Sequence, residues 1–165
     1  MILGSGMFPL TDEEADRFAN FCVVQGVRGY QLRKALRPRR DLDVTEMEEL
    51  RKKWMLPILS LEEDMRAADT LKRQLTAVYD FLTAIGAYER CLVQQEKLIG
   101  LGQRQTAAED AQMWNSLMAA LDQMHMLMGD GRMNLRLLAD MIDQALGATV
   151  IRTLPQSADA VSAHL

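Results

Sequence analysis

Residues 10–36 read LTDEEADRFANFCVVQGVRGYQLRKAL. The segment begins as a capped amphipathic helix, because Thr11 precedes Glu14 by three residues in the pattern of a capping box. Apolar side chains then recur at helical spacing as far as Cys22, and Gly26 supplies a left-handed stop. We therefore predict one helix that ends at Gly26, followed by a short basic connection.

The same 3.6-residue recurrence of apolar side chains predicts five further helices. The predicted N-caps of four of them are Thr45, Thr70, Thr106 and Asn134. Two of these threonines would form capping boxes, with Glu48 and Glu109 respectively. The fourth helix is expected over roughly residues 87–101, and the predicted glycine stops of the later helices are Gly86, Gly102, Gly129 and Gly147.

The second predicted helix contains a proline. Its apolar positions keep a helical phase from Met47 to Met65, on both sides of Pro57. Proline inside a helix costs about 3 kcal/mol, so a break is possible in principle. The preserved phase favours one kinked helix over two unrelated ones.

The character of the chain changes after Gly147. Residues 149–155 read TVIRTLP, which is β-branched and short, typical of a strand or an extended exit. The predicted fold is all-α, an irregular bundle of about six helices with short extended segments at the termini. Residues 1–165 are expected to form a single helical accessory domain excised from a longer chain.

Composition limits the possible functions. The net charge of −4 and the pI near 5.2 argue against a dedicated nucleic-acid-binding module. The N-terminus lacks the pattern of a signal peptide, and no apolar run approaches 18 residues. Cys22 and Cys91 lie in helical patterns, so we expect reduced thiols in or near the core of a cytoplasmic protein.

Catalytic patterns are weak. The glycines never form a P-loop or a dinucleotide-binding loop. His125 has Asp122 three residues before it but no further partner, so a surface position is favoured over a catalytic or metal-binding role. Neither cysteine has a metal-ligand spacing. We predict no catalytic, cofactor-binding or metal-binding residue.

A basic run stands out in this acidic chain. No acid occurs from Arg17 to Arg40, yet this run holds seven of the 19 basic residues. It is either a solvated connection or a patch that contacts DNA phosphates, where counterion release would favour binding. The candidate DNA-backbone contacts are Arg28, Arg33, Lys34, Arg37, Arg39 and Arg40.

Methionines recur on the last two predicted helices. The fifth carries Met113, Met124 and Met128 on its apolar stripe. Such a stripe is either ordinary core filling or an adaptable binding face. The second possibility supports an alternative function, a free-standing helical adaptor that binds a partner through an apolar Met-rich groove.

Several phrases of the sequence resemble one family. The first is the opening helix together with the residues that follow it, Val27-Arg28-Gly29. The others are RKKWMLPILSLE at 51–62, TAVYDFL at 76–82, MWN at 113–115 and TLPQSAD at 153–159. In this order they resemble the AddB (RexB) subunit of the bacterial AddAB ATP-dependent helicase–nucleases. One departure is the exit phrase, which has a single proline, Pro155, where the family pattern has two.

The resemblance implies a helical 2B-type insert of that subunit, with no catalytic residue of its own. It implies that ATP, magnesium and an iron–sulfur cluster bind elsewhere in the parent chain. The implied partners are the rest of the subunit, an AddA-type helicase–nuclease subunit and DNA, without a membrane. The implied role is in double-strand break repair and recombination.

Overall fold

The computed structural model describes residues 8–37, 43–127 and 131–152. Its elements are α1 (Asp12–Gln25), the 3-10 helix η2 (Gly29–Arg33), α2 (Thr45–Ala67), α3 (Leu71–Ala84), α4 (Ala87–Gly100), α5 (Arg104–Leu127) and α6 (Leu135–Arg152). Within these ranges there is no β-strand. The predicted all-α fold of about six helices is therefore confirmed.

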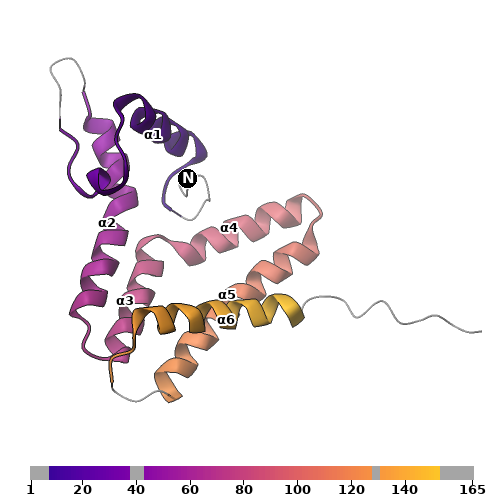
Figure 1. Cartoon of the computed structure of the whole chain (residues 1–165). Coiled ribbons are helices and arrows are strands. Elements are labelled where there is room, and N and C mark those ends of the chain that lie inside the picture. Colours follow the sequence, from indigo (N-terminus) through magenta and orange to yellow (C-terminus); the bar gives the residue numbers. More distant parts are fainter. Residues whose placement is uncertain (1–7, 38–42, 128–130, 153–165) are drawn as a thin grey trace, which may run out of the picture.

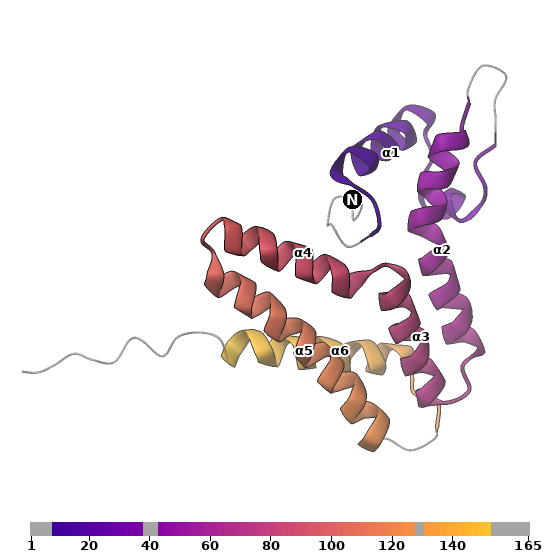
Figure 2. The same cartoon turned by 180° about the vertical axis from the view of Figure 1, so that it is seen from behind.

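The long helix α2 joins two parts of the molecule (Figure 1). Its first half packs against α1 and η2, and α3 runs back alongside its second half. Helices α4 and α5 form an antiparallel pair, and α6 crosses over α5, as the view from behind also shows (Figure 2). Helix α1 packs on α2 and on no other α-helix of the described chain, so its place depends on α2.

Apolar side chains form two separate clusters. The buried members of the N-terminal cluster are Leu10, Ala15, Phe18, Cys22, Leu32, Leu50 and Met55. The buried members of the C-terminal cluster are Leu71, Leu75, Leu121, Met124 and Leu138. Helix α2 contributes to both, because Met65 near its end packs against the C-terminal cluster.

Three predicted helix starts are confirmed. The amide of Thr11 donates to Glu14 Oε2 (2.8 Å), while the amide of Glu14 donates to Thr11 Oγ1 (3.2 Å), which completes the capping box. Thr70 Oγ1 accepts from the amide of Arg73, and Asn134 Oδ1 accepts from the amide of Arg136. Each cap satisfies an amide that has no partner within its helix.

The predicted capping box of α2 is wrong. Thr45 is already helical, and the Asp43 carboxylate accepts from its amide (2.8 Å) and its hydroxyl (2.6 Å). The carboxylate of Glu48 instead has two other partners, Arg51 and the amide of Leu36. A charged partner and a tertiary contact thus outweigh a local box.

The predicted box of α5 is also wrong. The helix begins three residues earlier than predicted, at Arg104 and not at Ala107, and the amide of Ala107 donates to the carbonyl of Gln103. Thr106 therefore lies within the first turn, and Glu109 accepts from Gln105 instead. Gly102, with φ of +77°, ends the preceding helix and turns the chain directly into α5.

The predicted end of the last helix, at Gly147, is also wrong. Gly147 does not stop α6, which continues to Arg152, so residues 149–152 are helical and not extended. A glycine in a helix interior costs only about 0.5–1 kcal/mol relative to alanine, which helical continuation can absorb. Pro57 lies within one unbroken helix, as predicted. The expected stop at Gly129 and the extended segments at 1–7 and 153–155 lie outside the described residues.

Candidate nucleic-acid interface

The basic connection between α1 and α2 is held in a defined shape. Gly26 adopts the left-handed conformation (φ +66°), and the amide of Val27 donates to the carbonyl of Cys22 at 2.9 Å. Gly29, also left-handed (φ +50°), opens η2, where the amide of Arg28 donates to the side chain of Gln31. These bonds direct the chain back toward α2.

A buried ion pair fastens this connection to α2. The Arg51 guanidinium, only 5% exposed, donates Nε to Glu48 Oε2 (2.7 Å) and Nη2 to Glu48 Oε1 (2.6 Å). Its Nη1 donates to the carbonyl of Leu32 (3.0 Å), and the amide of Leu36 donates to Glu48 Oε2 (2.9 Å). The Arg51 hydrogen bonds hold the pKa of the Glu48 carboxyl below its usual range. One carboxylate and one guanidinium thus hold the middle of the connection, at Leu32 and Leu36.

The candidate DNA contacts divide into three groups. Arg33 is engaged in an ion pair with Glu62. Arg28, Lys34 and Arg37 are exposed and make no ion pair with other described residues. Arg39 and Arg40 lie outside the described residues. Of the four candidates within the described residues, three are therefore available to an external anion.

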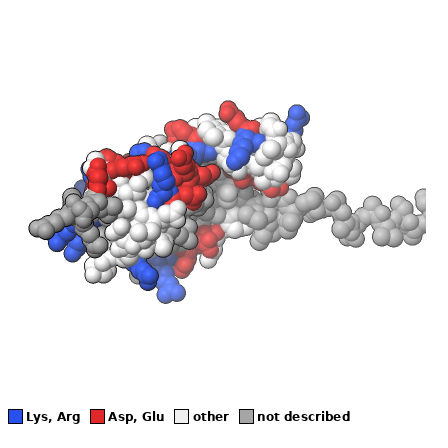
Figure 3. All heavy atoms as spheres, turned by 90° about the horizontal axis from the view of Figure 1, so that it is seen from above, with Lys and Arg blue, Asp and Glu red and all other residues white. Residues whose placement is uncertain are grey.

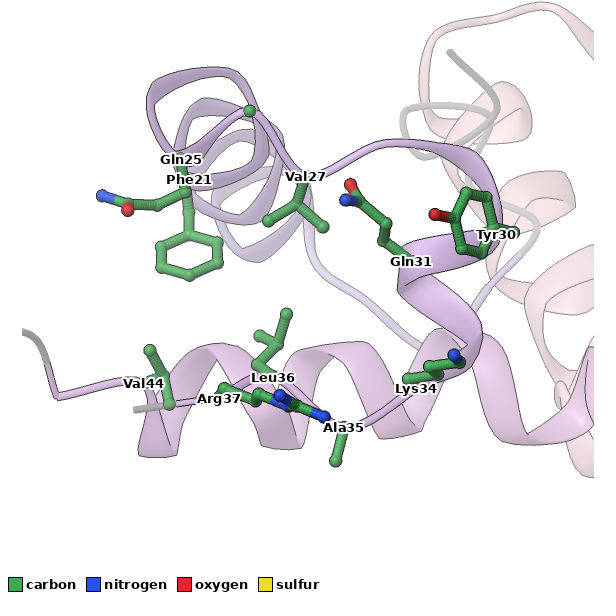
Figure 4. A pocket seen from close by; sticks show the side chains of 11 residues that line it. Phe21, Gln25, Val27, Tyr30, Gln31, Lys34, Ala35, Leu36, Arg37 and Val44 are labelled. Carbon is green, nitrogen blue, oxygen red and sulfur yellow. The ribbon is translucent and has the colours of Figure 1, made fainter. Parts of the chain in front are cut away.

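A cavity of about 350 Å³ opens beside these cations. Figure 4 shows Phe21 and Val27 reaching into it from the side of α1 and Leu36 from the opposite side. Lys34 and Arg37 also line it, and none of the described residues that line it is acidic. The site therefore combines an apolar interior with a positive rim.

The charge of the surrounding surface is mixed. Acidic and basic side chains are interspersed on the face seen from above (Figure 3). Arg17 is paired with Glu46 (2.8 Å) and Lys53 with Glu14 (2.8 Å). The positive character of the connection is therefore local and not part of a broad basic field.

The other candidate sites of the described chain are weaker than the basic connection. His125 and Asp122 are exposed on α5. No group of three or more His, Cys, Asp or Glu residues in the described ranges could hold a metal ion. An iron–sulfur cluster held by cysteines alone takes four of them, and this chain has only two, on α1 and α4, so its residues do not fit such a cluster. None of the described helices is both long and apolar enough to cross a membrane.

The predicted methionine stripe divides between core and surface, and its third member, Met128, lies outside the described residues. Met124 is buried in the C-terminal cluster, and Met118, Met133 and Met141 pack against it. Met126, by contrast, is 83% exposed, and Met113 is 42% exposed. Several methionines of the last two helices therefore fill the core, while Met113 and Met126 remain on the surface.

The sequence patterns did not reveal the cavity or the ion pair that fastens it. Phe21, Gln25 and Gln31 were not predicted to share a site, because they come together only through the turn at Gly26. Glu48 and Arg51 are spaced by three residues on one helix, a detectable signal of pairing. Their burial depends on a chain segment 12 to 19 residues earlier, which no local pattern indicates.

No protein-family model matches the chain. The chain does match curated proteins, which are the B subunits of ATP-dependent helicase/deoxyribonucleases. The protein from Lysinibacillus sphaericus is 24% identical over 166 residues, covering 90% of this chain and 14% of the relative. That from Clostridium botulinum (strain Hall) is 26% identical over 172 residues, covering 96% and 15%. That from Moorella thermoacetica is 26% identical over 176 residues, covering 98% and 15%.

The chain thus spans 14–15% of the length of these three relatives. The similarity extends over nearly the whole of this chain and points each time to a protein of the same name. The resemblance to a segment of the AddB-type subunit is therefore confirmed.

Proposed function

We propose that this chain is a non-catalytic helical domain of an AddB-type subunit, within an ATP-dependent helicase–nuclease that acts in double-strand break repair and recombination. The observation that carries the proposal is the match of 90–98% of the chain to one segment of the B subunits of ATP-dependent helicase/deoxyribonucleases. The partners would be the rest of that subunit, an AddA-type subunit and DNA.

The proposal places the reaction chemistry outside this domain. ATP, magnesium and any iron–sulfur cluster would bind elsewhere in the complex. The buried polar side chains of the described residues support this placement. They are Arg51 and Gln74, and both make hydrogen bonds to the backbone that hold the fold together. The domain would contribute shape, packing and contacts to the DNA backbone.

Catalytic function is tested in the whole complex. His125→Ala and Asp122→Asn remove the side chains of the catalytic candidate predicted from the sequence. We expect unchanged rates of DNA-stimulated ATP hydrolysis and of strand cleavage in both variants, because both groups are exposed and the described residues supply neither with the partners that proton transfer requires. A tenfold or greater loss in either rate, with the complex still assembled, would place chemistry in this domain.

DNA contact is tested by charge reversal in the same complex. The variant Arg28→Glu/Lys34→Glu/Arg37→Glu changes the three exposed cations of the connection. We expect weaker binding to DNA ends and a shallower dependence of affinity on salt, by about 0.9 in the logarithmic slope for each phosphate that is no longer neutralised.

A matched control reverses the same amount of charge elsewhere. Lys72, Lys97 and Arg136 are exposed on α3, α4 and α6 and take no part in the ion pairs of the described chain. Their reversal to glutamate should change the salt slope far less than reversal in the connection. Equal effects of the two triple variants would mean that net charge alone acts, and the proposed DNA contact would be rejected.

A further inference from the structure

We infer that the cavity between α1 and the basic connection binds one unpaired base of a DNA strand, with phosphates of that strand on Lys34 and Arg37. This inference rests on the proposed DNA contact and specifies its ligand as single-stranded DNA. The cavity size is about 350 Å³, near the lower end for small-molecule sites. It suits one planar group and not an extended ligand.

The interior of the cavity is apolar. Phe21 and Val27 face Leu36 across it, and Val44 adds a further apolar wall (Figure 4). All four side chains are buried or half-buried, so the walls are set by the N-terminal cluster and are formed before a ligand arrives. A nucleobase has apolar faces that such walls accept.

The rim is selective for anions. Lys34 and Arg37 line the cavity, and among residues 8–37, 43–127 and 131–152 no acidic side chain lines it. Tyr30 is 72% exposed and also lines the cavity, which is an unusual degree of exposure for an aromatic ring. An exposed ring beside two cations is the combination by which proteins hold single strands, through base stacking and phosphate contact.

Two side-chain amides add hydrogen-bonding capacity. Gln31 uses its carbonyl oxygen to accept from the amide of Arg28 (2.9 Å), so its NH2 group faces no partner among the described residues. Gln25 also lines the cavity. Amide groups bind the edges of unpaired bases, whereas a base inside a duplex is stacked and paired and cannot enter a pocket.

An acidic peptide with an apolar side chain is the other ligand that would suit a positive rim and an apolar interior. The exposed ring of Tyr30 and the free amide of Gln31 favour the nucleotide, because stacking and edge recognition use both. The two ligand classes are distinguished directly by competition.

The experiment uses the 165-residue chain and fluorescein-labelled probes at low salt. The probes are (dT)8, an abasic octamer with the same phosphates, and a 12-base-pair duplex. We expect (dT)8 to bind about tenfold more tightly than the abasic octamer, the usual order of effect for one stacked base. Tyr30→Ala should remove most of this difference, and Tyr30→Phe should retain it. Tyr79→Ala is the matched control, because it removes an exposed ring that lies elsewhere, on α3.

A second readout identifies the contact itself. An octamer with one 5-iodouracil should photo-cross-link to Phe21 or Tyr30, located by mass spectrometry. Equal affinity for (dT)8 and the abasic octamer would overturn the inference, as would stronger competition by an acidic, phenylalanine-containing octapeptide than by (dT)8. If Lys34→Glu/Arg37→Glu still weakens the abasic and duplex probes in that case, the proposed backbone contact stands alone. If this double variant weakens the binding of no probe, both the base-binding inference and the proposed backbone contact are rejected.

Discussion

Gln74 and Met133 form a two-way hydrogen-bonded pair across 59 residues of sequence. The side-chain NH2 of Gln74 donates to the carbonyl of Met133, and its carbonyl oxygen accepts from the amide of Met133, both at 2.9 Å. Gln74 is fully buried (0% exposed) on α3, and Met133 lies just before α6. One side chain thus satisfies both backbone groups of a residue that leads into the last helix.

The first prediction removes this pair. Gln74→Leu should lower the free energy of unfolding by about 2–4 kcal/mol, because the amide and carbonyl of the half-buried Met133 both lose the buried Gln74 side chain as their partner. Urea titration followed by circular dichroism measures the loss. The control is Gln112→Leu on an exposed position of α5, which should change stability little. Similar losses in both variants would mean that the Gln74 bonds are not formed in solution.

The second prediction concerns pH and the buried pair of Glu48 and Arg51. The Arg51 hydrogen bonds lower the pKa of Glu48 from its ordinary value of 4.5. A lowered pKa contributes stability that is fully present above about 4.5 and is lost as the pH falls through the lowered value. Glu48→Gln should therefore reduce stability at pH 7 by about 2–4 kcal/mol, since Arg51 keeps a buried charge without its partner.

The same variant should differ less from the parent chain at acid pH. Below the lowered pKa the carboxyl of Glu48 is protonated, so the parent chain no longer has this contribution. Glu49→Gln on the neighbouring exposed position, which pairs with Lys52, is the control and should give a small effect at every pH. A constant difference between Glu48→Gln and the parent chain from pH 7 to pH 3 would contradict the role of the ion pair.

The helix starts separate what the sequence can predict from what it cannot. The caps at Thr11 and Thr70 follow from contacts three residues apart, so the local pattern was sufficient. The predicted box at Thr45 failed because Glu48 is bound by Arg51 and by the amide of Leu36, a partner outside its helix. Local pattern and tertiary structure compete for the same carboxylate.

The faces of the helices were predictable only in part. The helical spacing of apolar residues predicts that Leu71, Leu75, Leu92 and Ile99 face the core. Leu71 and Leu75 are buried, whereas Leu92 and Ile99 of α4 are 40% and 52% exposed. Helix α4 packs mainly on α5, and its apolar spacing did not identify the residues that face this partner. The candidate cations were visible as a run without acids, but the pairing of Arg33 with Glu62 depends on how α2 passes the connection.

The third prediction tests these helix starts by mutation. Thr11→Ala and Thr70→Ala should each lower stability by about 1 kcal/mol, because each leaves a first-turn amide without its acceptor. Thr106→Ala should be neutral or slightly stabilising, since Thr106 lies inside α5, where alanine has the higher helix propensity. Thermal unfolding of the three variants is the measurement. A loss at Thr106 equal to that at Thr11 would restore the cap predicted from the sequence and contradict the observed start of α5.

The last prediction addresses the two apolar clusters. Phe18 (0% exposed) belongs to the N-terminal cluster and Leu75 (7% exposed) to the C-terminal cluster. Phe18→Ala should speed amide hydrogen exchange in α1, η2 and the first half of α2, and should leave α3 and α6 protected. Leu75→Ala should do the reverse, and each change should cost about 2–5 kcal/mol locally.

This separation is expected because α1 packs on no α-helix of the described chain other than α2. The proposed base-binding cavity is built on the N-terminal cluster, so Phe18→Ala should also weaken (dT)8 binding, whereas Leu75→Ala should not. Exchange followed by mass spectrometry on peptides from each helix resolves the two regions. Uniform acceleration over all the helices in both variants would show instead that the chain opens as one cooperative unit, with the cavity no less stable than the rest of the fold.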